Sequence, residues 1–318
     1  MSAAANPPLR VLIAEAEHAR YAALLHELAP ELEVYGSAQP LELAHHAASC
    51  PLWLGQPDLL APLLREGRPP QWLQSTWAGI TPLLANDLPT DYVLTRAVGI
   101  FGQVMAEYVL GHLLAHERQL STHLHAQHEQ RWERRAPQSL AGRTLLIVGT
   151  GDIGLSVAQF LAPFGIRLLG IATQSRRLSP FAQVSGLAAL PALASEADYL
   201  INLLPDTPAT RDIYDAALFA ACKPNAVFIN AGRGVAVVDE ALVSALQQGQ
   251  LAGAVIDVCR EEPLPAGHPF WTAPRLLLTG HTAAPTDPRL LVQVFVHNLA
   301  RWKAAEPLRG QVDFQRGY

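Results

Sequence analysis

Short apolar runs alternate with helical patterns over the first hundred residues. Compact runs rich in Leu, Val, Ile and Trp favour buried strands, whereas apolar positions three and four residues apart favour helices. We expect strands at residues 9–14, 52–54, 72–74 and 92–95, with helices around residues 19–28 and 41–47. This alternation is typical of an α/β unit with a parallel sheet.

The alternation resumes after a long helical stretch, rich in Leu, Ala and His, from Gly99 to roughly His128. A last helix, about residues 290–303, follows when the second unit is complete. The economical topology returns that helix to the first unit, so the second unit is an insertion. Six strands are expected in the second unit, at residues 145–148, 168–171, 199–204, 227–230, 254–258 and 276–279.

A glycine-rich turn follows the first strand of the second unit, with the sequence Gly149-Thr150-Gly151-Asp152-Ile153-Gly154. In a G-x-G-x-x-G turn, the first glycine permits the tight turn and the second lets the backbone approach a pyrophosphate. The third lets the helix pack closely on the strand. An apolar run before the turn and a helical pattern after it, stopped by Gly165, supply the required context. The turn predicts a dinucleotide site, although a glycine-rich turn without a ligand remains the alternative.

These patterns predict two doubly wound parallel-sheet α/β domains. A dinucleotide-binding Rossmann domain, residues 98–282, is inserted into a smaller flavodoxin-like substrate domain formed by residues 1–97 and 283–318. The length of 318 residues suits two domains. Half of the residues are hydrophobic and only 16% are charged, which fits buried parallel strands.

Charge, cysteine content and hydropathy exclude several other classes of protein. A formal net charge of −5 offers no basic surface for nucleic acid. No window reaches transmembrane length, so we expect no membrane partner and a cytoplasmic location. The three cysteines, which lack CxxC spacing, argue for a reducing compartment and against zinc. His112 and His116 have helical spacing, but no acid or cysteine set accompanies them, and no metal site is predicted.

Three polar segments each follow a strand of the second unit. They are residues 230–234 (Asn-Ala-Gly-Arg-Gly), 257–264 and 280–285. Ligands of open α/β sheets bind beyond the carboxyl ends of the strands, so these segments are expected at one crevice. Arg233 can present a planar fork to a carboxylate, or alternatively tie two loops together. His281, given a carboxylate partner, is suited to proton transfer near neutral pH.

Taken together, G-x-G-x-x-G, N-A-G-R-G, D-V-x-x-x-E-P-L and G-H-x-A, in this order and spacing, resemble the D-isomer-specific 2-hydroxyacid dehydrogenase family. The stretch from Phe101 to Leu110 resembles the family's glyoxylate/hydroxypyruvate reductase branch. Two positions depart from the common pattern. Gly280 stands where many members have proline, and Cys259 stands where an aromatic residue is frequent. Neither departure removes a catalytic group.

The resemblance implies roles for individual residues. The family's catalytic arginine, glutamate and histidine correspond to Arg233, Glu262 and His281. Arg233 would bind the substrate carboxylate and polarise the 2-oxo group. His281, held and kept protonated by Glu262, would then donate a proton while hydride arrives from the nicotinamide. The substrate-binding residues that the resemblance implies are Trp53, Leu54, Trp77, Ala78, Gly79, Arg233 and His281.

The cofactor site is expected to favour NADPH, with NAD as the weaker alternative. NAD-preferring members carry an acid at the end of the second strand, and by spacing that place is Ala172. No Asp or Glu occurs between residues 153 and 195. The guanidinium groups that follow this strand can bind a 2′-phosphate, unless they are only a solvated pair on a turn. The predicted cofactor-binding residues are Met105, Gly149, Thr150, Gly151, Asp152, Ile153, Thr173, Ser175, Arg176, Arg177, Leu203, Leu204, Pro205, Thr210, Ala231, Gly232, Arg233, Asp257, His281 and Ala283.

The predicted activity is reduction of small 2-oxo acids, such as glyoxylate and hydroxypyruvate, to D-2-hydroxy acids. A dehydrogenase of bulkier D-2-hydroxy acids would use the same machinery. A non-catalytic NAD(P)-sensing, corepressor-like protein is the rival from another class, although it would not need all three of Arg233, Glu262 and His281. The apolar stretch 104–120 exceeds what one buried face requires, which predicts a homodimer, as is common in the family.

Overall fold

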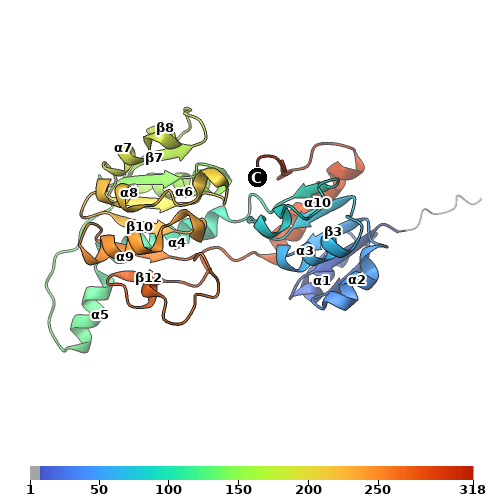
Figure 1. Cartoon of the computed structure of the whole chain (residues 1–318), viewed down its shortest axis with the longest axis horizontal. Helices are drawn as coiled ribbons and strands as arrows, with labels where there is room; N and C mark the ends of the chain where they lie inside the picture. Colours follow the sequence, from blue (N-terminus) through green and yellow to red (C-terminus); the bar gives the residue numbers. More distant parts are fainter. Residues whose placement is uncertain (1–7, 318) are drawn as a thin grey trace, which may run out of the picture. The chain divides into compact units, whose positions relative to one another are not determined.

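The computed structural model describes residues 8–317, which form two compact units (Figure 1). The first unit consists of the described residues up to Ile100 and from Thr286 onward, and the second of Phe101–Pro285. Each unit is built around a single parallel sheet. The expectation of two parallel-sheet α/β domains is thereby confirmed.

The first unit has a five-stranded sheet with the order β2-β1-β3-β4-β5. This order is the flavodoxin-like one. The last helix packs against the first, so the expected return of the chain to this unit is confirmed. The strands are β1 Arg10–Ala14, β2 Glu33–Ser37, β3 Leu52–Gly55, β4 Trp72–Ser75 and β5 Val93–Thr95, and the helices are α1 His18–Leu28, α2 Pro40–Ala47, α3 Pro57–Glu66 and α10 Pro288–Lys303.

The second unit has a seven-stranded parallel sheet with the order β12-β11-β10-β9-β6-β7-β8. Six of its strands, from β8 at one edge to β11, follow the Rossmann order, and β12 is added at the other edge. The strands are β6 Thr144–Val148, β7 Arg167–Ala172, β8 Gln183–Gly186, β9 Tyr199–Asn202, β10 Val227–Asn230, β11 Gly253–Ile256 and β12 Leu276–Leu278. The helices are α4 Gly102–Glu117, α5 Leu120–His128, α6 Asp152–Leu161, α7 Leu190–Ala194, α8 Ala216–Ala221 and α9 Asp239–Gln247. Short 3-10 turns over both units are Thr81–Leu84, Ala162–Phe164, Leu187–Ala189, Pro208–Thr210, Gly234–Ala236 and Pro269–Trp271.

The structure differs from the expected elements in three places. The second unit has a seventh strand, β8, whose Gln-Val-Ser-Gly sequence contains no apolar run and lies at the sheet edge. The helical stretch from Gly99 to His128 is not continuous, because Gln119 has a φ of 53° and ends α4 before α5 begins. The edge strand β2 in the first unit was also not predicted, since its five residues alternate poorly and are mostly half-buried.

The core of the second unit lies on both faces of its sheet. Strand β6 is buried throughout, and its side chains alternate between the two faces. Leu145 and Ile147 pack with Val109 of α4 on one face, whereas Leu146 and Val148 pack with Leu242 of α9 on the other. Burial on both faces makes the strand continuously apolar and holds its carboxyl end, where the glycine-rich turn begins, in a rigid position.

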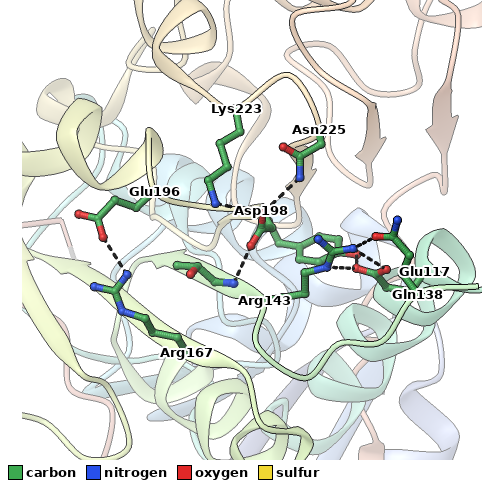
Figure 2. A network of polar contacts seen from close by, with 10 residues as sticks. Glu117, Gln138, Arg143, Arg167, Glu196, Asp198, Lys223 and Asn225 are labelled. Atoms are coloured by element: carbon green, nitrogen blue, oxygen red, sulfur yellow. Dashed lines mark hydrogen bonds and ion pairs between the residues drawn. The ribbon is translucent and has the colours of Figure 1, made fainter.

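A polar network closes the opposite end of this sheet (Figure 2). Glu117, 4% exposed, accepts hydrogen bonds from Arg143 Nε at 2.7 Å and from the Tyr199 hydroxyl at 2.6 Å. Asp198 accepts the backbone N–H of Thr144 at 2.8 Å and an ammonium N–H of Lys223 at 3.0 Å. The network ties the C-terminal end of α4 to the first residues of β6 and β9. It therefore stabilises the sheet at the end opposite the glycine-rich turn.

None of the helices within residues 8–317 has the length and apolar character to cross a bilayer. Over the same range, no group of three or more His, Cys, Asp or Glu side chains is arranged to hold a metal ion.

Candidate active site

The glycine-rich turn between β6 and α6 requires glycine at two of its three glycine positions for steric reasons. Gly149 has a φ of 106°, and a Cβ there would lie 2.8 Å from the Leu203 carbonyl oxygen. A Cβ on Gly154 would lie 2.0 Å from the Gly149 carbonyl oxygen. A side chain at Gly149 would therefore collide with the segment after β9, and one at Gly154 would push α6 away from the turn.

Gly151, the middle glycine, differs because a Cβ there would meet only open space. It is the N-cap residue of α6, whose first residues are Asp152 and Ile153. The first N–H groups of a helix have no partner within the helix, and the helix dipole favours an anion there. The open space at Gly151 is where a pyrophosphate can approach the backbone, so the turn fits a dinucleotide.

The segment after β7 folds back against the turn. Arg176 donates from Nη2 to the Thr150 carbonyl oxygen at 2.8 Å and to the Thr150 hydroxyl at 3.3 Å. The Ser175 hydroxyl accepts the N–H of Gly186 at 3.2 Å. Arg177 is exposed and forms no hydrogen bond or ion pair with any of residues 8–317. Thr173 is also exposed. One arginine therefore braces the turn while its neighbour extends into solvent.

Two asparagines at the ends of β9 and β10 organise the adjacent loops, and the sequence reasoning missed both. Asn202 donates from Nδ2 to Asn230 Oδ1 at 2.9 Å, and both side chains are fully buried. Asn202 Oδ1 accepts the N–H of Leu204 at 3.1 Å, and Asn230 Oδ1 accepts that of Gly232 at 3.2 Å. An amide as the last residue of an otherwise apolar strand was the signal that could have identified them.

Other predicted cofactor residues lie in the loops after β9 and β10. The Thr210 hydroxyl donates to the Pro205 carbonyl at 2.7 Å, and the Leu203 N–H donates to the Val148 carbonyl at 2.8 Å. The Ala231 N–H donates to the Asn202 carbonyl at 3.2 Å. Met105 of α4 and Ala283 are instead buried in the core on one face of the sheet.

Arg233 follows β10 in a closely packed loop. A Cβ on the next residue, Gly234, would lie 2.0 Å from the carbonyl carbon of Cys259, so that position requires glycine. The Arg233 guanidinium donates from Nη1 to the Gly232 carbonyl oxygen at 2.6 Å. The loop is thereby held against the segment that carries Glu262.

Glu262 and His281 form a hydrogen-bonded pair. His281 Nδ1 lies 2.7 Å from Glu262 Oε2, and Glu262 Oε1 accepts the N–H of Cys259 at 2.8 Å. Both side chains are partly exposed, 52% for His281 and 37% for Glu262. Because Nδ1 is occupied by the carboxylate, Nε2 is the nitrogen left to exchange a proton with a ligand.

The pair shifts the pKa values of both groups. The hydrogen bond to Glu262 raises the pKa of His281 above its usual value, outweighing burial and the nearby Arg233 charge, which lower it. Burial alone would raise the pKa of Glu262, but the hydrogen bonds from His281 and the Cys259 N–H leave it lowered. The geometry therefore favours an imidazolium–carboxylate pair, with a proton ready at the histidine.

The loop from Thr279 to Ala283 has an unusual backbone. His281 has a φ of 60° and Gly280 a φ of 64°, a value that proline cannot adopt. Asp257, 3% exposed, accepts the N–H groups of Thr282 at 2.8 Å and Ala283 at 3.1 Å. The carboxylate of Asp257, a predicted cofactor-binding residue, thus holds the loop that carries His281.

In the first unit, the segment Trp77-Ala78-Gly79 follows β4. Trp77 is 37% exposed, and its N–H donates to the Ser75 hydroxyl at 3.1 Å. Ala78 and Gly79 are half-buried, and neither donates its N–H to another residue in the described part of the chain.

Trp53 and Leu54, which were predicted to bind the substrate, lie in the interior of the first unit. Both side chains are fully buried in the first unit, and the Trp53 indole N–H donates to the Cys50 carbonyl at 3.0 Å. Their side chains pack in the core, and the backbone of β3 pairs with β1 on one side and with β4 on the other.

Comparison with known proteins agrees with this geometry. The model of the D-isomer specific 2-hydroxyacid dehydrogenase NAD binding domain matches residues 110–283. Glyoxylate/hydroxypyruvate reductase A of Serratia proteamaculans is 37% identical over 248 residues, which cover 76% of this chain and 79% of the relative.

Two solved structures extend the similarity to both units. A D-isomer specific 2-hydroxyacid dehydrogenase family protein from Aeromonas salmonicida has a TM-score of 0.91 and 37% identity, covering 96% of this chain and 99% of its own. An NADPH-dependent glyoxylate/hydroxypyruvate reductase from Sinorhizobium meliloti, in complex with NADP and sulfate, has a TM-score of 0.84 and 31% identity, covering 98% and 100%. The chain belongs to the D-isomer specific 2-hydroxyacid dehydrogenase family.

Proposed function

We propose that this protein reduces small 2-oxo acids, such as glyoxylate and hydroxypyruvate, to D-2-hydroxy acids with NADPH. The observation that carries the proposal is the pair of His281 and Glu262, on the same edge of the sheet as the glycine-rich turn and Arg233. Relatives named glyoxylate/hydroxypyruvate reductase support the substrate class. A non-catalytic sensor would have no use for a histidine whose pKa is raised by a dedicated carboxylate.

Each residue has a distinct role in the proposed reaction. The Arg233 guanidinium binds the substrate carboxylate with its planar fork and polarises the neighbouring oxo group. When bound, NADPH supplies the hydride. His281 donates the proton from Nε2 to the developing alkoxide, and Glu262 stabilises the imidazolium and fixes its orientation.

The choice of NADPH over NADH rests on the segment after β7. The acid that would bond a ribose 2′-hydroxyl is replaced by Ala172, and Arg177 extends into solvent two residues after exposed Ser175. A 2′-phosphate carries nearly two negative charges, which a guanidinium binds and a carboxylate repels. Similar proteins crystallised with NADPH or NADP support the same choice.

The decisive experiment is a steady-state assay of the purified protein over a panel of 2-oxo acids with both cofactors. We expect the largest kcat/KM for glyoxylate or hydroxypyruvate with NADPH. A preference for branched or aromatic 2-oxo acids would favour the dehydrogenase of bulkier substrates. NADPH binding without turnover of any 2-oxo acid would contradict the proposal and favour the sensor.

A homodimer is a separate proposal. Large apolar side chains are exposed on α4, α5 and the loop after them, namely Leu114, Leu120, Leu124 and Trp132. Exposed apolar side chains in one stretch of chain favour an interface with a second copy. Sedimentation at micromolar concentration should give a dimer, and Leu124→Glu with Trp132→Glu should shift it toward monomer; a wild-type monomer contradicts the proposal.

A cytoplasmic location is proposed from the cysteines. Cys50, Cys222 and Cys259 are all free thiols, as expected in a reducing compartment. Fractionation of cells that express the protein would test it.

A further inference from the structure

A chain of two hydroxyl groups leads from helix α4 to Asp257. The Tyr108 hydroxyl lies 2.8 Å from Thr279 Oγ1, which donates to Asp257 Oδ1 at 2.6 Å. A carboxylate only accepts hydrogen bonds, so the single hydroxyl proton of Thr279 is committed to Asp257. Tyr108 must therefore be the donor to Thr279. The negative charge of the Asp257 carboxylate therefore fixes the donor and the acceptor in both hydrogen bonds.

Asp257 holds the backbone of His281 and of the two residues after it. Its carboxylate accepts the N–H groups of Thr282 and Ala283, while its backbone oxygen accepts the His281 N–H at 2.6 Å. His281 has a φ of 60°, a conformation that a non-glycine residue keeps only when its surroundings enforce it. The direction in which Nε2 points consequently depends on how firmly Asp257 is held.

We infer that Tyr108 is a positioning residue for His281, acting through Thr279 and Asp257. The inference rests on the proposed function, because it concerns the proton donor of that reaction. The Tyr108 hydroxyl polarises the Thr279 hydroxyl and so strengthens its bond to the buried carboxylate. A phenylalanine would fill the same volume, so the hydroxyl is the part of Tyr108 that serves the loop. The ring itself packs edge-on against His112, with 4.4 Å between ring centroids.

The first test is kinetic. Tyr108→Phe removes one neutral hydrogen bond, so kcat should fall roughly three- to tenfold while the KM for the 2-oxo acid changes less than twofold. Thr279→Val should lower kcat further because Asp257 loses a donor, whereas Thr279→Ser keeps the hydroxyl and should restore activity close to wild type.

Tyr199→Phe is the matched control. Its hydroxyl also donates to a buried carboxylate of this unit, that of Glu117, at 2.6 Å, but at the opposite end of the sheet. Its kcat should equal that of the wild type. Equal losses of kcat in Tyr108→Phe and Tyr199→Phe would show a general destabilisation of the unit and would overturn the inference.

A double mutant tests the connection itself. If Tyr108 acts through Thr279, adding Tyr108→Phe to Thr279→Val should cause no further loss of kcat. A loss in the Thr279→Val background as large as in the wild type would overturn the inference, as would a Tyr108→Phe enzyme with unchanged kcat.

Amide hydrogen exchange gives a measurement that needs no substrate. In Tyr108→Phe, the amides of Thr282 and Ala283 should exchange several times faster than in the wild type, and in Tyr199→Phe they should not. Unchanged exchange overturns the inference even if the proposed reaction is correct. Faster exchange in a protein that reduces no 2-oxo acid would instead show that the proposed function fails while the hydroxyl chain holds.

Discussion

Glu262 and His281 are 19 residues apart in the sequence, yet Oε2 of the first lies 2.7 Å from Nδ1 of the second. The contact forms because β11 and β12 are neighbours in a parallel sheet, so the loops after them leave the same edge. It has two chemical consequences. The imidazole is held through Nδ1, which leaves Nε2 for a ligand, and the hydrogen bond to Glu262 raises the pKa of His281 and so stabilises its protonated form.

Replacing His281 with alanine should remove the proton donor. We expect kcat to fall by roughly 10²–10⁴-fold, the usual scale for general acid catalysis. NADPH affinity, measured by fluorescence titration, should stay nearly unchanged because the glycine-rich turn is untouched. Wild-type turnover in His281→Ala would assign the proton donor elsewhere.

Glu262→Gln should change the pH profile of reduction. The reaction needs protonated His281, so activity is present below the pKa of His281 and is lost as the pH rises through it. Because Glu262 raises that pKa above 6.5, the wild-type decline should lie above pH 6.5. The glutamine removes the raising charge, and the decline should move to lower pH. A kcat/KM profile that stays in place would leave Glu262 a purely structural role.

Arg233→Lys keeps the positive charge but loses the planar guanidinium, which can donate two parallel hydrogen bonds to a carboxylate. Charge-assisted hydrogen bonds contribute about 1.5–3 kcal/mol, so kcat/KM for any 2-oxo acid should fall by roughly 10- to 100-fold. A simple ketone without a carboxylate serves as the control substrate. An equal loss with that ketone would point to a folding defect rather than to carboxylate binding.

Arg177→Ala and Arg176→Ala should have different effects on the two cofactors. Arg177 extends into solvent, so its loss should weaken NADPH binding by about tenfold and leave NADH unaffected. Arg176 braces Thr150 of the glycine-rich turn, so its loss should weaken both. Added salt should reduce NADPH affinity more than NADH affinity, and Ala172→Asp should favour NADH by repelling the phosphate. Equal wild-type kcat/KM for both cofactors would contradict the assignment.

The network in Figure 2 provides a stability prediction with an internal control. Arg143 pairs with Glu117, whose side chain is only 3% exposed, so Arg143→Met should leave a buried charge unpaired and lower the free energy of unfolding by about 3 kcal/mol. Arg167 pairs with Glu196, and the two side chains are 49% and 46% exposed. Arg167→Met should therefore lower the free energy of unfolding by less than about 1 kcal/mol. Urea denaturation would compare them, and equal losses would contradict the distinction.

Much of this architecture is determined by local sequence. The apolar runs of β6, β9 and β10 identify buried parallel strands because both of their faces must be covered. Gly149 and Gly154 stand where the backbone has no room for a side chain. The signals for Arg233, Glu262 and His281 are equally local, since each lies in a polar segment after an apolar strand.

Other features depend on contacts between distant segments, and only the tertiary structure decided them. Strand β8 and the break at Gln119 have weak local signals, because an edge strand and a helix end are selected by what packs beside them. Arg176 and Arg177 cannot be distinguished from the sequence alone, but in the structure Arg176 donates a hydrogen bond to Thr150 and Arg177 does not. Likewise, the resemblance makes Trp53 a candidate for substrate binding, but its side chain is fully buried in the core. The direction of His281 is set by Asp257 and, through Thr279, by Tyr108, 171 residues away from Thr279 in the sequence. A local pattern determines which residues a strand end can offer, whereas hydrogen bonds and packing across the chain decide where their side chains point.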